Sequence, residues 1–287
     1  MWTRALKQER VCVVGLGLMG GSLALAIRDD VAKLSAIEPD EGTRSQAAAL
    51  GLLDDASAEL GDLLGEATIV VLAAPVRTNL RLLPELPEFL APGTLVLDVG
   101  STKRATIAAM DELPQELLAV GGHPMCGKER AGFGAADSEL FAEKTFVLCD
   151  SERTTPEAEA KAEALVGALG ARPLWMDAAT HDAAVATVSH LPYALSAALV
   201  AATDGLREEG QALIASGFRD TSRVAGSDPR MIADILVTNA DLLLPVLARA
   251  RGALDELVRR IEAEDPEALA AHLGSVQRRW HQLNRRS

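Results

Sequence analysis

A histidine held between glycines and a proline is the side chain in this sequence best suited to acid–base chemistry. His123 follows Gly121 and Gly122 and precedes Pro124, directly after an apolar run that is typical of a β-strand. Imidazole titrates near neutral pH, so a fixed histidine can accept the proton of a hydroxyl group that is being oxidised. An isolated loop histidine is more often solvated or structural, so the prediction of a general base depends on what lies beside His123.

Ser101 is the second candidate for chemistry, because it follows the preceding strand-like run at a similar point. The carboxyl ends of parallel strands meet at one edge of a sheet, so we expect the Ser101 hydroxyl to lie near His123. A serine in this position can also cap the next helix, and the two roles are compatible. We predict Ser101 and His123 as the catalytic pair.

A glycine-rich turn near the start of the chain indicates what these residues face. The turn fits GxGxxG and lies between a predicted strand and an apolar helix. Its glycines allow a tight turn, the approach of a pyrophosphate and close packing of helix on strand. The helix N-terminus offers unpaired N–H groups and partial positive charge to phosphate. We therefore predict a dinucleotide site that includes Gly15, Leu16, Gly17, Leu18, Met19 and Gly20.

The identity of the dinucleotide is indicated by Glu38, which ends the second predicted strand about 20 residues further on. A carboxylate there can accept hydrogen bonds from ribose hydroxyls, whereas a 2′-phosphate would meet repulsion from Glu38 and the nearby Asp40. NAD is therefore favoured, and Arg44 leaves NADP as the less favoured alternative. Ala74 and Pro75, small residues at the end of another strand, are predicted to contact the cofactor from the fold alone.

Cationic and polar residues in the second part of the chain can bind an anion. Pro192 lacks an N–H group and is predicted to kink a helix just after His190, which opens space at a site. Arg219 and Arg223 are four residues apart and share a face if they are helical, and guanidinium groups bind carboxylates in a bidentate manner. The alternatives are a buried structural histidine and a solvated charged face.

The elements that must position these residues change in type along the chain. Strand-like runs alternate with helical patterns as far as Asp177, which is typical of a doubly wound α/β sheet. We predict a Rossmann-type dinucleotide-binding domain over 1–177 and an all-helical substrate and dimerisation domain over 178–287, with turns at Gly217, from Gly226 to Pro229, and at Asp265. The expected strands are Val11–Val14, Leu34–Ile37, Thr68–Ala73, Thr94–Val99, Leu117–Gly121, Thr145–Leu148 and Pro173–Trp175.

Two apolar seams at helical spacing end the chain, and each predicts a long helix. They are compatible with a hairpin within one chain and with a helix-mediated homodimer, because two adjacent seams often exceed what one small domain covers. The seams consist of Leu243, Leu247, Ala250, Leu254, Leu257 and Ile261, and of Leu269, Leu273, Val276, Trp280 and Leu283.

Composition limits the partners and the location. A net charge of −13 argues against nucleic acid and anionic membranes, although a small, locally bound anion remains compatible with it. The 3 cysteines cannot all pair and show no metal-ligand spacing, so we expect reduced thiols and no metal. The segment from Met1 to Arg10 lacks the apolar core of a signal peptide, and we expect a cytoplasmic protein.

Several of these segments together resemble the prephenate/arogenate dehydrogenase family of tyrosine biosynthesis, from about Val11 to beyond Pro229. The blocks around His123 and Arg223 are far more specific than the glycine turn. Two features depart from the family pattern: lysine is common where Arg219 stands, and an aromatic residue often follows the SDP turn where this chain has Met231 and Ile232. The matching segments are GLGLMGGS, AAPV, DVGSTK, GGHPMCGKERAG, VSHLP and GFRDTSRVAGSDP.

The resemblance implies an oxidoreductase that transfers a hydride from a cyclohexadiene acid to NAD or NADP while the ring carboxylate leaves as carbon dioxide. It implies that His123 takes the ring-hydroxyl proton and that Ser101 orients it. It also implies that Arg223 binds a substrate carboxylate and that His190 lies near the substrate side chain. Glu129 and Arg219 resemble residues at the rim of the pocket.

The substrate and the alternatives follow from the same residues. His190 favours prephenate over arogenate, because a hydrogen-bond donor there suits a carboxylate or keto oxygen. We expect a monofunctional enzyme, with no chorismate mutase segment before the glycine turn and no ACT-like domain at the end. A β-hydroxyacid or imine-reducing dehydrogenase is disfavoured because no lysine follows Lys161. An NAD-sensing protein without catalysis is the alternative from another class.

Overall fold

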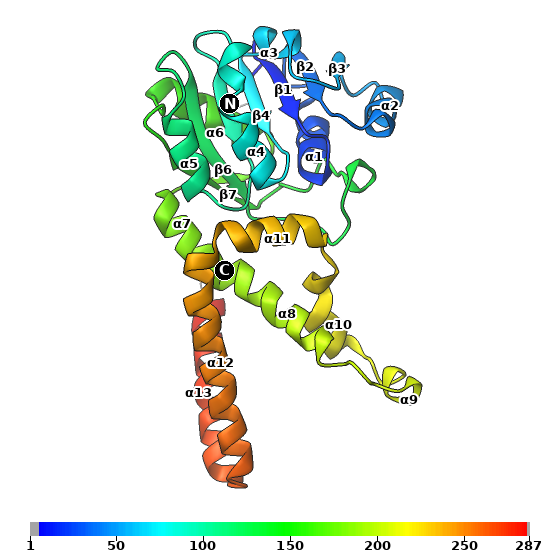
Figure 1. The fold of residues 1–287 in the computed structure, drawn as a ribbon, viewed down its shortest axis with the longest axis vertical. Helices are drawn as coiled ribbons and strands as arrows, with labels where there is room; N and C mark the ends of the chain where they lie inside the picture. Colours follow the sequence, from blue (N-terminus) through cyan, green and yellow to red (C-terminus); the bar gives the residue numbers. More distant parts are fainter. Residues whose placement is uncertain (1–5, 286–287) are drawn as a thin grey trace. The chain divides into compact units, whose positions relative to one another are not determined.

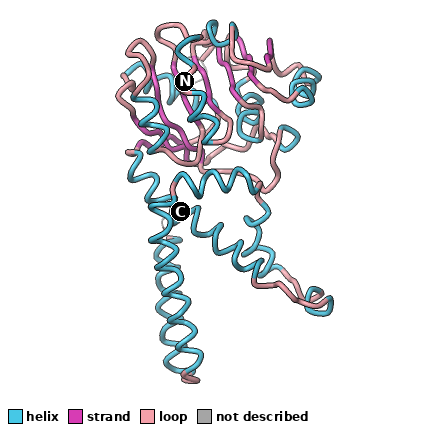
Figure 2. The backbone as a smooth tube through the Cα atoms, in the orientation of Figure 1, coloured by secondary structure: helices cyan, strands magenta, loops and turns pink. Residues whose placement is uncertain are grey.

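The computed structural model describes residues 6–285 and contains one eight-stranded sheet in the order β3-β2-β1-β4-β5-β6-β7-β8. Strand β7 runs antiparallel to β6, and the other neighbouring strands pair in parallel. Figure 2 shows that the strands belong to the N-terminal part and are flanked by helices. The strands are β1 (Arg10–Val14), β2 (Lys33–Ile37), β3 (Asp55–Ser57), β4 (Ile69–Leu72), β5 (Leu95–Asp98), β6 (Leu118–Pro124), β7 (Thr145–Asp150) and β8 (Arg172–Trp175).

Helices cover both faces of this sheet, so the central strands are apolar on both sides. In β1, Val11 and Val13 belong to one buried cluster, and Cys12 and Val14 belong to the cluster on the opposite face. Burying each such valine contributes about 1.5–3 kcal/mol to folding. The helices of this part are α1 (Leu18–Ile27), α2 (Glu41–Ala49), α3 (Asp62–Glu66), α4 (Val76–Leu82), α5 (Arg104–Asp111) and α6 (Pro156–Ala168).

The predicted doubly wound α/β class is confirmed, and each of the expected strands is present. Sequence patterns missed β3, because this three-residue edge strand is polar and none of its side chains is fully buried. They also ended β6 too early. His123 was expected in a loop, but it lies inside β6, opposite Val147 of β7, because antiparallel pairing extends that strand to Pro124.

Helices follow the sheet from Asp177 onward, as expected. Pro192 lies in the first turn of the helix Leu191–Ala201, directly after a π-helical turn at Ala186–His190. The kink predicted at Pro192 stays a prediction. The turn predicted at Gly217 is wrong, because Gly217 lies in the first turn of the helix Ser216–Ser222. The predicted turn before Pro229 is present, and Asp228 caps the helix that follows. These helices are α7 (Ala178–Val185), α8 (Leu191–Ala201), α9 (Glu208–Gln211), α10 (Ser216–Ser222) and α11 (Pro229–Thr238).

The chain divides into two compact units, and the boundary along the chain lies between Ala240 and Asp241. The second unit consists of the long helices α12 (Ala240–Glu262) and α13 (Pro266–Asn284), which lie side by side in Figures 1 and 2. Both predicted seams lie on these helices, and Asp265 caps α13 as expected. Six of the eleven seam side chains are 48–61% exposed, including Leu254, Ile261 and Trp280, whereas Leu243 is buried. The predicted domain boundary after Asp177 stays a prediction.

Two further expectations concern the chain ends and membranes. The expectation for Met1 to Arg10 falls partly on residues 1–5, which lie outside the described residues. By length and composition alone, Ala178–Ala201 could span a membrane, with a mean hydropathy of 1.5, and α11 with α12 would qualify as one bent pair. Asp182 in the first of these segments is nevertheless hydrogen-bonded to the start of α5, so the segment packs as part of the folded unit.

The close packing around the glycine turn predicts that alanine destabilises the protein at one glycine of the turn and not at another. A Cβ on Gly20 would lie 1.9 Å from the carbonyl oxygen of Gly15, whereas a Cβ on Gly17 would meet nothing within 4 Å. We expect Gly20→Ala to lower the free energy of unfolding by at least about 1–3 kcal/mol, the usual cost of overpacking. Gly17→Ala is the matched control and should be close to the parent in urea unfolding. Equal stability of the two variants would contradict this packing.

Candidate functional site

A cavity of about 470 Å³ lies at the carboxyl ends of the sheet strands, within the first unit. Five segments form its wall: the glycine turn, the ends of β4 and β5, the end of β6 with the loop that follows, and α11. The predicted site residues that line it are Gly17, Leu18, Met19, Ala74, Pro75, Ser101, His123 and Glu129. The structure therefore brings both predicted catalytic residues and five of the nine predicted cofactor residues to one cavity, whereas Gly15, Leu16, Gly20 and Glu38 lie outside its lining.

The glycine turn is shaped to receive a phosphate group. Gly15 has a φ of +96°, which L side chains rarely adopt, and its N–H donates to the carbonyl of Ile37 at 2.8 Å. Helix α1 then begins at Leu18 with neither a side-chain cap nor an acidic residue in its first turn. Its first N–H groups therefore suit anionic oxygens, and the missing side chain of Gly17 leaves room for them. The site fits the pyrophosphate of a dinucleotide.

Glu38 lies beside the same turn although it does not line the cavity. Its carboxylate oxygens accept the N–H groups of Leu16 at 2.7 Å and Asp40 at 3.0 Å. Each oxygen keeps a second lone pair that can accept a ribose hydroxyl. Arg44, the residue that left NADP open, donates to the backbone carbonyls of Glu38 at 2.6 Å and Pro39 at 2.9 Å. Its guanidinium group is thus engaged by the protein's own backbone.

His123 does not stand alone, because a second histidine lies behind it. His123 Nδ1 is 2.8 Å from His181 Nε2, and the two rings meet edge to face with centroids 5.0 Å apart. His181 Nδ1 is in turn 2.8 Å from Asp182 Oδ1. His181 and Asp182 are each about 1% exposed, whereas His123 is 8% exposed and reaches the cavity. A buried chain of three side chains therefore ends at the cavity wall.

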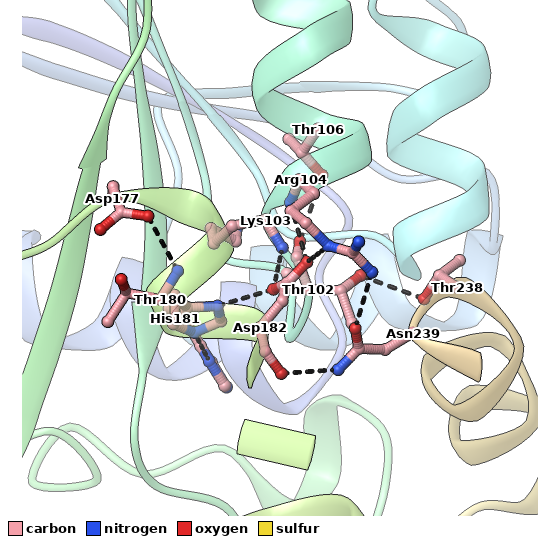
Figure 3. A network of polar contacts seen from close by, with 12 residues as sticks. Thr102, Lys103, Arg104, Thr106, Asp177, Thr180, His181, Asp182, Thr238 and Asn239 are labelled. Carbon is pink, nitrogen blue, oxygen red and sulfur yellow. Dashed lines mark hydrogen bonds and ion pairs between the residues drawn. The ribbon is translucent and has the colours of Figure 1, made fainter. Parts of the chain in front are cut away.

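Asp182 joins α7 to the start of α5, as Figure 3 shows. Its carboxylate accepts the backbone N–H groups of Lys103 at 2.8 Å and Arg104 at 2.9 Å, and also Nε of Arg104 at 3.3 Å. The two backbone donors lie at the N-terminus of α5, where the helix dipole favours an anion. Burial opposes ionisation of Asp182, but the bonds from His181 and these backbone N–H groups outweigh it and lower its pKa.

A buried ion pair fixes the backbone just before His123. Lys103 Nζ contacts Asp98 Oδ1 at 2.6 Å and the carbonyl oxygen of Gly122 at 2.6 Å, and Asp98 Oδ1 accepts the N–H of Gly122 at 3.1 Å. Neither charged side chain is exposed. Removing one partner of a buried pair typically costs about 3–5 kcal/mol, so the pair constrains this backbone strongly.

Burial favours the neutral forms of His123 and His190. The pKa of His123 lies well below 6.5, first because of burial and then because of the positive charge that His181, Lys103 and His190 can place nearby. Burial also lowers the pKa of His190 to about 4, although Asp182 opposes this shift. At neutral pH the imidazole of His123 can therefore accept a proton.

His190 is 2% exposed and lies outside the cavity lining. Its Nδ1 is 3.3 Å from Asn239 Nδ2, and Asn239 also donates to the carbonyl of Asp182 at 2.8 Å. Because Asn239 Oδ1 accepts from Arg104 at 3.1 Å, the amide nitrogen faces His190, whose Nδ1 must then accept. The proton of His190 consequently sits on Nε2, which is buried without a partner among residues 6–285.

The predicted anion-binding arginines also lie outside the cavity lining. Arg223 forms an ion pair with Glu129, which does line the cavity, and its side chain is 61% exposed. Arg219 is exposed on α10. The cationic residues that line the cavity are Lys128, Arg130 and Arg230. Arg223 therefore approaches the cavity only through its partner Glu129.

Sequence reasoning missed the residues that support His123 from within. His181 is 58 residues from His123, and Asn239 is 57 residues from Asp182 and 135 from Arg104, so no local spacing connects these partners. An available signal was the adjacent histidine and aspartate in the otherwise apolar segment Ala178–Ala201. Among residues 6–285 no group of three or more His, Cys, Asp or Glu side chains could hold a metal ion.

Comparison with protein-family models assigns both parts of the chain. Residues 23–174 match the prephenate dehydrogenase nucleotide-binding domain, and residues 177–275 match the prephenate dehydrogenase dimerization domain. These two models support the expected order of a Rossmann-type part followed by a helical part.

Curated relatives and solved structures agree with these matches. Prephenate dehydrogenase of Bacillus subtilis is 33% identical over 91% of this chain and 72% of its own length. Cyclohexadienyl dehydrogenase of Zymomonas mobilis is 32% identical over 94% of both chains. Synechocystis arogenate dehydrogenase is 34% identical, with a TM-score of 0.79, and the alignment covers 96% of this chain and 99% of that one.

A structure of prephenate dehydrogenase from A. aeolicus in complex with hydroxyphenyl propionate and NAD+ is also similar. It is 27% identical, with a TM-score of 0.88, and the alignment covers 97% of this chain and 99% of that one. A 3-hydroxyisobutyrate dehydrogenase at 18% identity and a TM-score of 0.60 shares the fold alone. The nucleotide-binding turn, the cavity with its histidine, the two family models and the curated relatives agree: this chain belongs to the prephenate dehydrogenase family.

Proposed function

We propose that this chain oxidises prephenate to 4-hydroxyphenylpyruvate with NAD and releases the ring carboxylate as carbon dioxide, in tyrosine biosynthesis. The observation that carries this proposal is His123, a buried and neutral histidine at the wall of a cavity that also contains the glycine turn. NAD bound at this turn supplies the hydride acceptor. Arogenate dehydrogenase, or a broad cyclohexadienyl activity, is the alternative substrate assignment.

The cofactor would be held by the turn and its neighbours. The N–H groups at the start of α1 suit the pyrophosphate, and Glu38 suits the ribose hydroxyls. Ala74 and Pro75 line the cavity with little side-chain bulk, so a nucleotide can lie against the backbone there. The predicted NAD cofactor agrees with the nucleotide-binding family model and with NAD+ in the A. aeolicus relative.

His123 would act as the general base. Its Nε2 would take the proton of the ring hydroxyl while a hydride leaves the substrate and the carbon–carbon bond to the carboxylate breaks. The electron pair of that bond then completes an aromatic ring, which makes the step effectively irreversible. Ser101 lines the same cavity and would orient the ring hydroxyl.

An anionic substrate needs cations in a chain with a net charge of −13. We assign the binding of a substrate carboxylate to Arg223, which would exchange its ion pair with Glu129 for the substrate. Arg219 and Glu129 would shape the rim of the cavity. His190 would direct its Nε2 proton, which has no partner in the described part of the chain, toward the substrate side chain.

Assembly and location complete the proposal. We assign a homodimer formed through the helical region, because apolar side chains remain exposed along α12 and α13 and the match to the dimerization domain covers most of this region. We also assign a cytoplasmic location, where reduced thiols are the rule. Cys12, Cys126 and Cys149 form no disulfide with one another.

Replacing His123 tests the chemistry directly. With prephenate and NAD, the parent should form NADH, and His123→Asn should lose mainly kcat, by roughly 100- to 10,000-fold, the usual contribution of a general base. His272→Asn is the matched control, because His272 lies on α13 outside the cavity lining. Equal rates for His123→Asn and the parent would remove His123 from the mechanism.

Replacing Arg223 tests the binding of the anion. Loss of a charged hydrogen bond to the substrate is expected to raise KM by roughly ten- to a hundredfold in Arg223→Ala, with a smaller effect on kcat. Steady-state kinetics of Arg219→Ala, on the same exposed helix region, provides the comparison. If only Arg219→Ala raised KM, the carboxylate would have to be assigned to Arg219 instead.

The substrate preference can be measured with the parent protein alone. A buried N–H donor on His190 suits the keto or carboxylate oxygen of prephenate better than the ammonium group of arogenate, because two donors repel. We therefore expect a higher kcat/KM for prephenate when both compounds are followed by NADH formation. A clear preference for arogenate would overturn this assignment.

A further inference from the structure

We propose that His181 and Asp182 are positioning residues that fix the proton of His123 on Nδ1 and so leave Nε2 as the basic nitrogen facing the cavity. This inference rests on the proposed role of His123 as the base. It concerns two residues buried behind the cavity wall, outside its lining.

The direction of the hydrogen bonds follows from Asp182. An ionised carboxylate only accepts hydrogen bonds, and Oδ1 of Asp182 accepts from the backbone N–H of Lys103 while Oδ2 accepts from Arg104. His181 Nδ1, at 2.8 Å from Oδ1, must therefore carry a proton and donate it. In the neutral form of His181 the ring has one N–H, so Nε2 is left with a lone pair.

The lone pair on His181 Nε2 then determines which nitrogen of His123 carries the proton. The two ring nitrogens are 2.8 Å apart, and because His181 Nε2 can only accept, His123 Nδ1 must donate. The remaining nitrogen of His123, Nε2, is therefore an unprotonated base. Without this chain the two neutral tautomers of His123 would compete, and the tautomer with the proton on Nε2 could not accept a substrate proton.

Asp182 also stabilises the positive charge that the reaction creates on His123. When His123 Nε2 takes the substrate proton, the ring becomes an imidazolium, and its Nδ1–H still points at His181. Asp182 lies one imidazole further on and supplies a buried negative charge. The donors around Asp182 hold it in place, so this charge needs little reorganisation during the reaction. Protons are conserved, because one proton moves from the substrate to His123.

Histidine nitrogen NMR of the parent protein tests the tautomer without any reaction. Long-range ¹H–¹⁵N correlation spectra distinguish protonated from unprotonated ring nitrogens, and the chain has only 5 histidines to assign with single variants. We expect both His123 and His181 to carry the proton on Nδ1. A proton on Nε2 of either ring would overturn the proposal, whether or not the protein turns over prephenate.

Two pairs of variants test the consequence for turnover. Asp182→Asn can donate to His181 and reverse the chain, so we expect kcat to fall by roughly 100- to 10,000-fold with KM for prephenate little changed. The matched control is Asp177→Asn at the N-cap of the same helix, where the Asp177 side chain accepts from the backbone N–H of Thr180. His181→Gln keeps an acceptor for His123 and should retain more activity than His181→Phe. Equal loss of kcat in the Asn variants, or in both His181 variants, would contradict a positioning role.

The outcomes separate this proposal from the proposed function. If the parent fails to oxidise prephenate while both rings carry the proton on Nδ1, the proposed prephenate dehydrogenase activity is wrong, and the proposed proton arrangement stands. If the parent oxidises prephenate but His123 carries its proton on Nε2, the proposed proton arrangement is wrong, and the proposed activity stands.

Discussion

The hydrogen bonds of one buried carboxylate connect the fold to the chemistry. Asp182 comes from the first helix after the sheet, yet it caps α5, a helix that covers one face of that sheet. The same carboxylate contacts His181 and, through it, the histidine at the cavity wall. An isolated anion at this depth would be strongly destabilising, so it requires donors on every side. Helix packing and the state of the histidine are therefore not independent.

Around this carboxylate, each further contact removes a degree of freedom from the site. The ion pair between Lys103 and Asp98 holds the backbone of Gly122, which orients the ring that follows it. Asn239 connects the π-helical turn to Arg104 and fixes the tautomer of His190. Rigid support of this kind is what a reactive group needs, since a misplacement of about 1 Å can cost about a hundredfold in rate.

Local sequence patterns predicted much of this molecule. They missed the contacts between residues that lie far apart in the sequence. The glycine turn, Glu38 and the strands are encoded in short stretches whose spacing has a direct physical meaning. His123 was recognised from its neighbours in sequence, although β7 pairing placed it in a strand. The support from Asp182 and Asn239 arises between distant segments, and a single sequence contains no periodicity that joins them. The position of Arg223 outside the cavity lining was likewise a matter of tertiary packing.

The separation of these residues along the chain also bears on the order in which the protein becomes active. His123 and His181 are 58 residues apart, and Arg104 and Asn239 are 135 residues apart. During synthesis the sheet can emerge in full before the helix that carries Asp182 is available to dock. Until that helix docks, a nascent chain has the nucleotide-binding turn, but His123 lacks its contact with His181. Completion of the site is thereby coupled to completion of the fold, because its supporting contacts join segments made far apart in time.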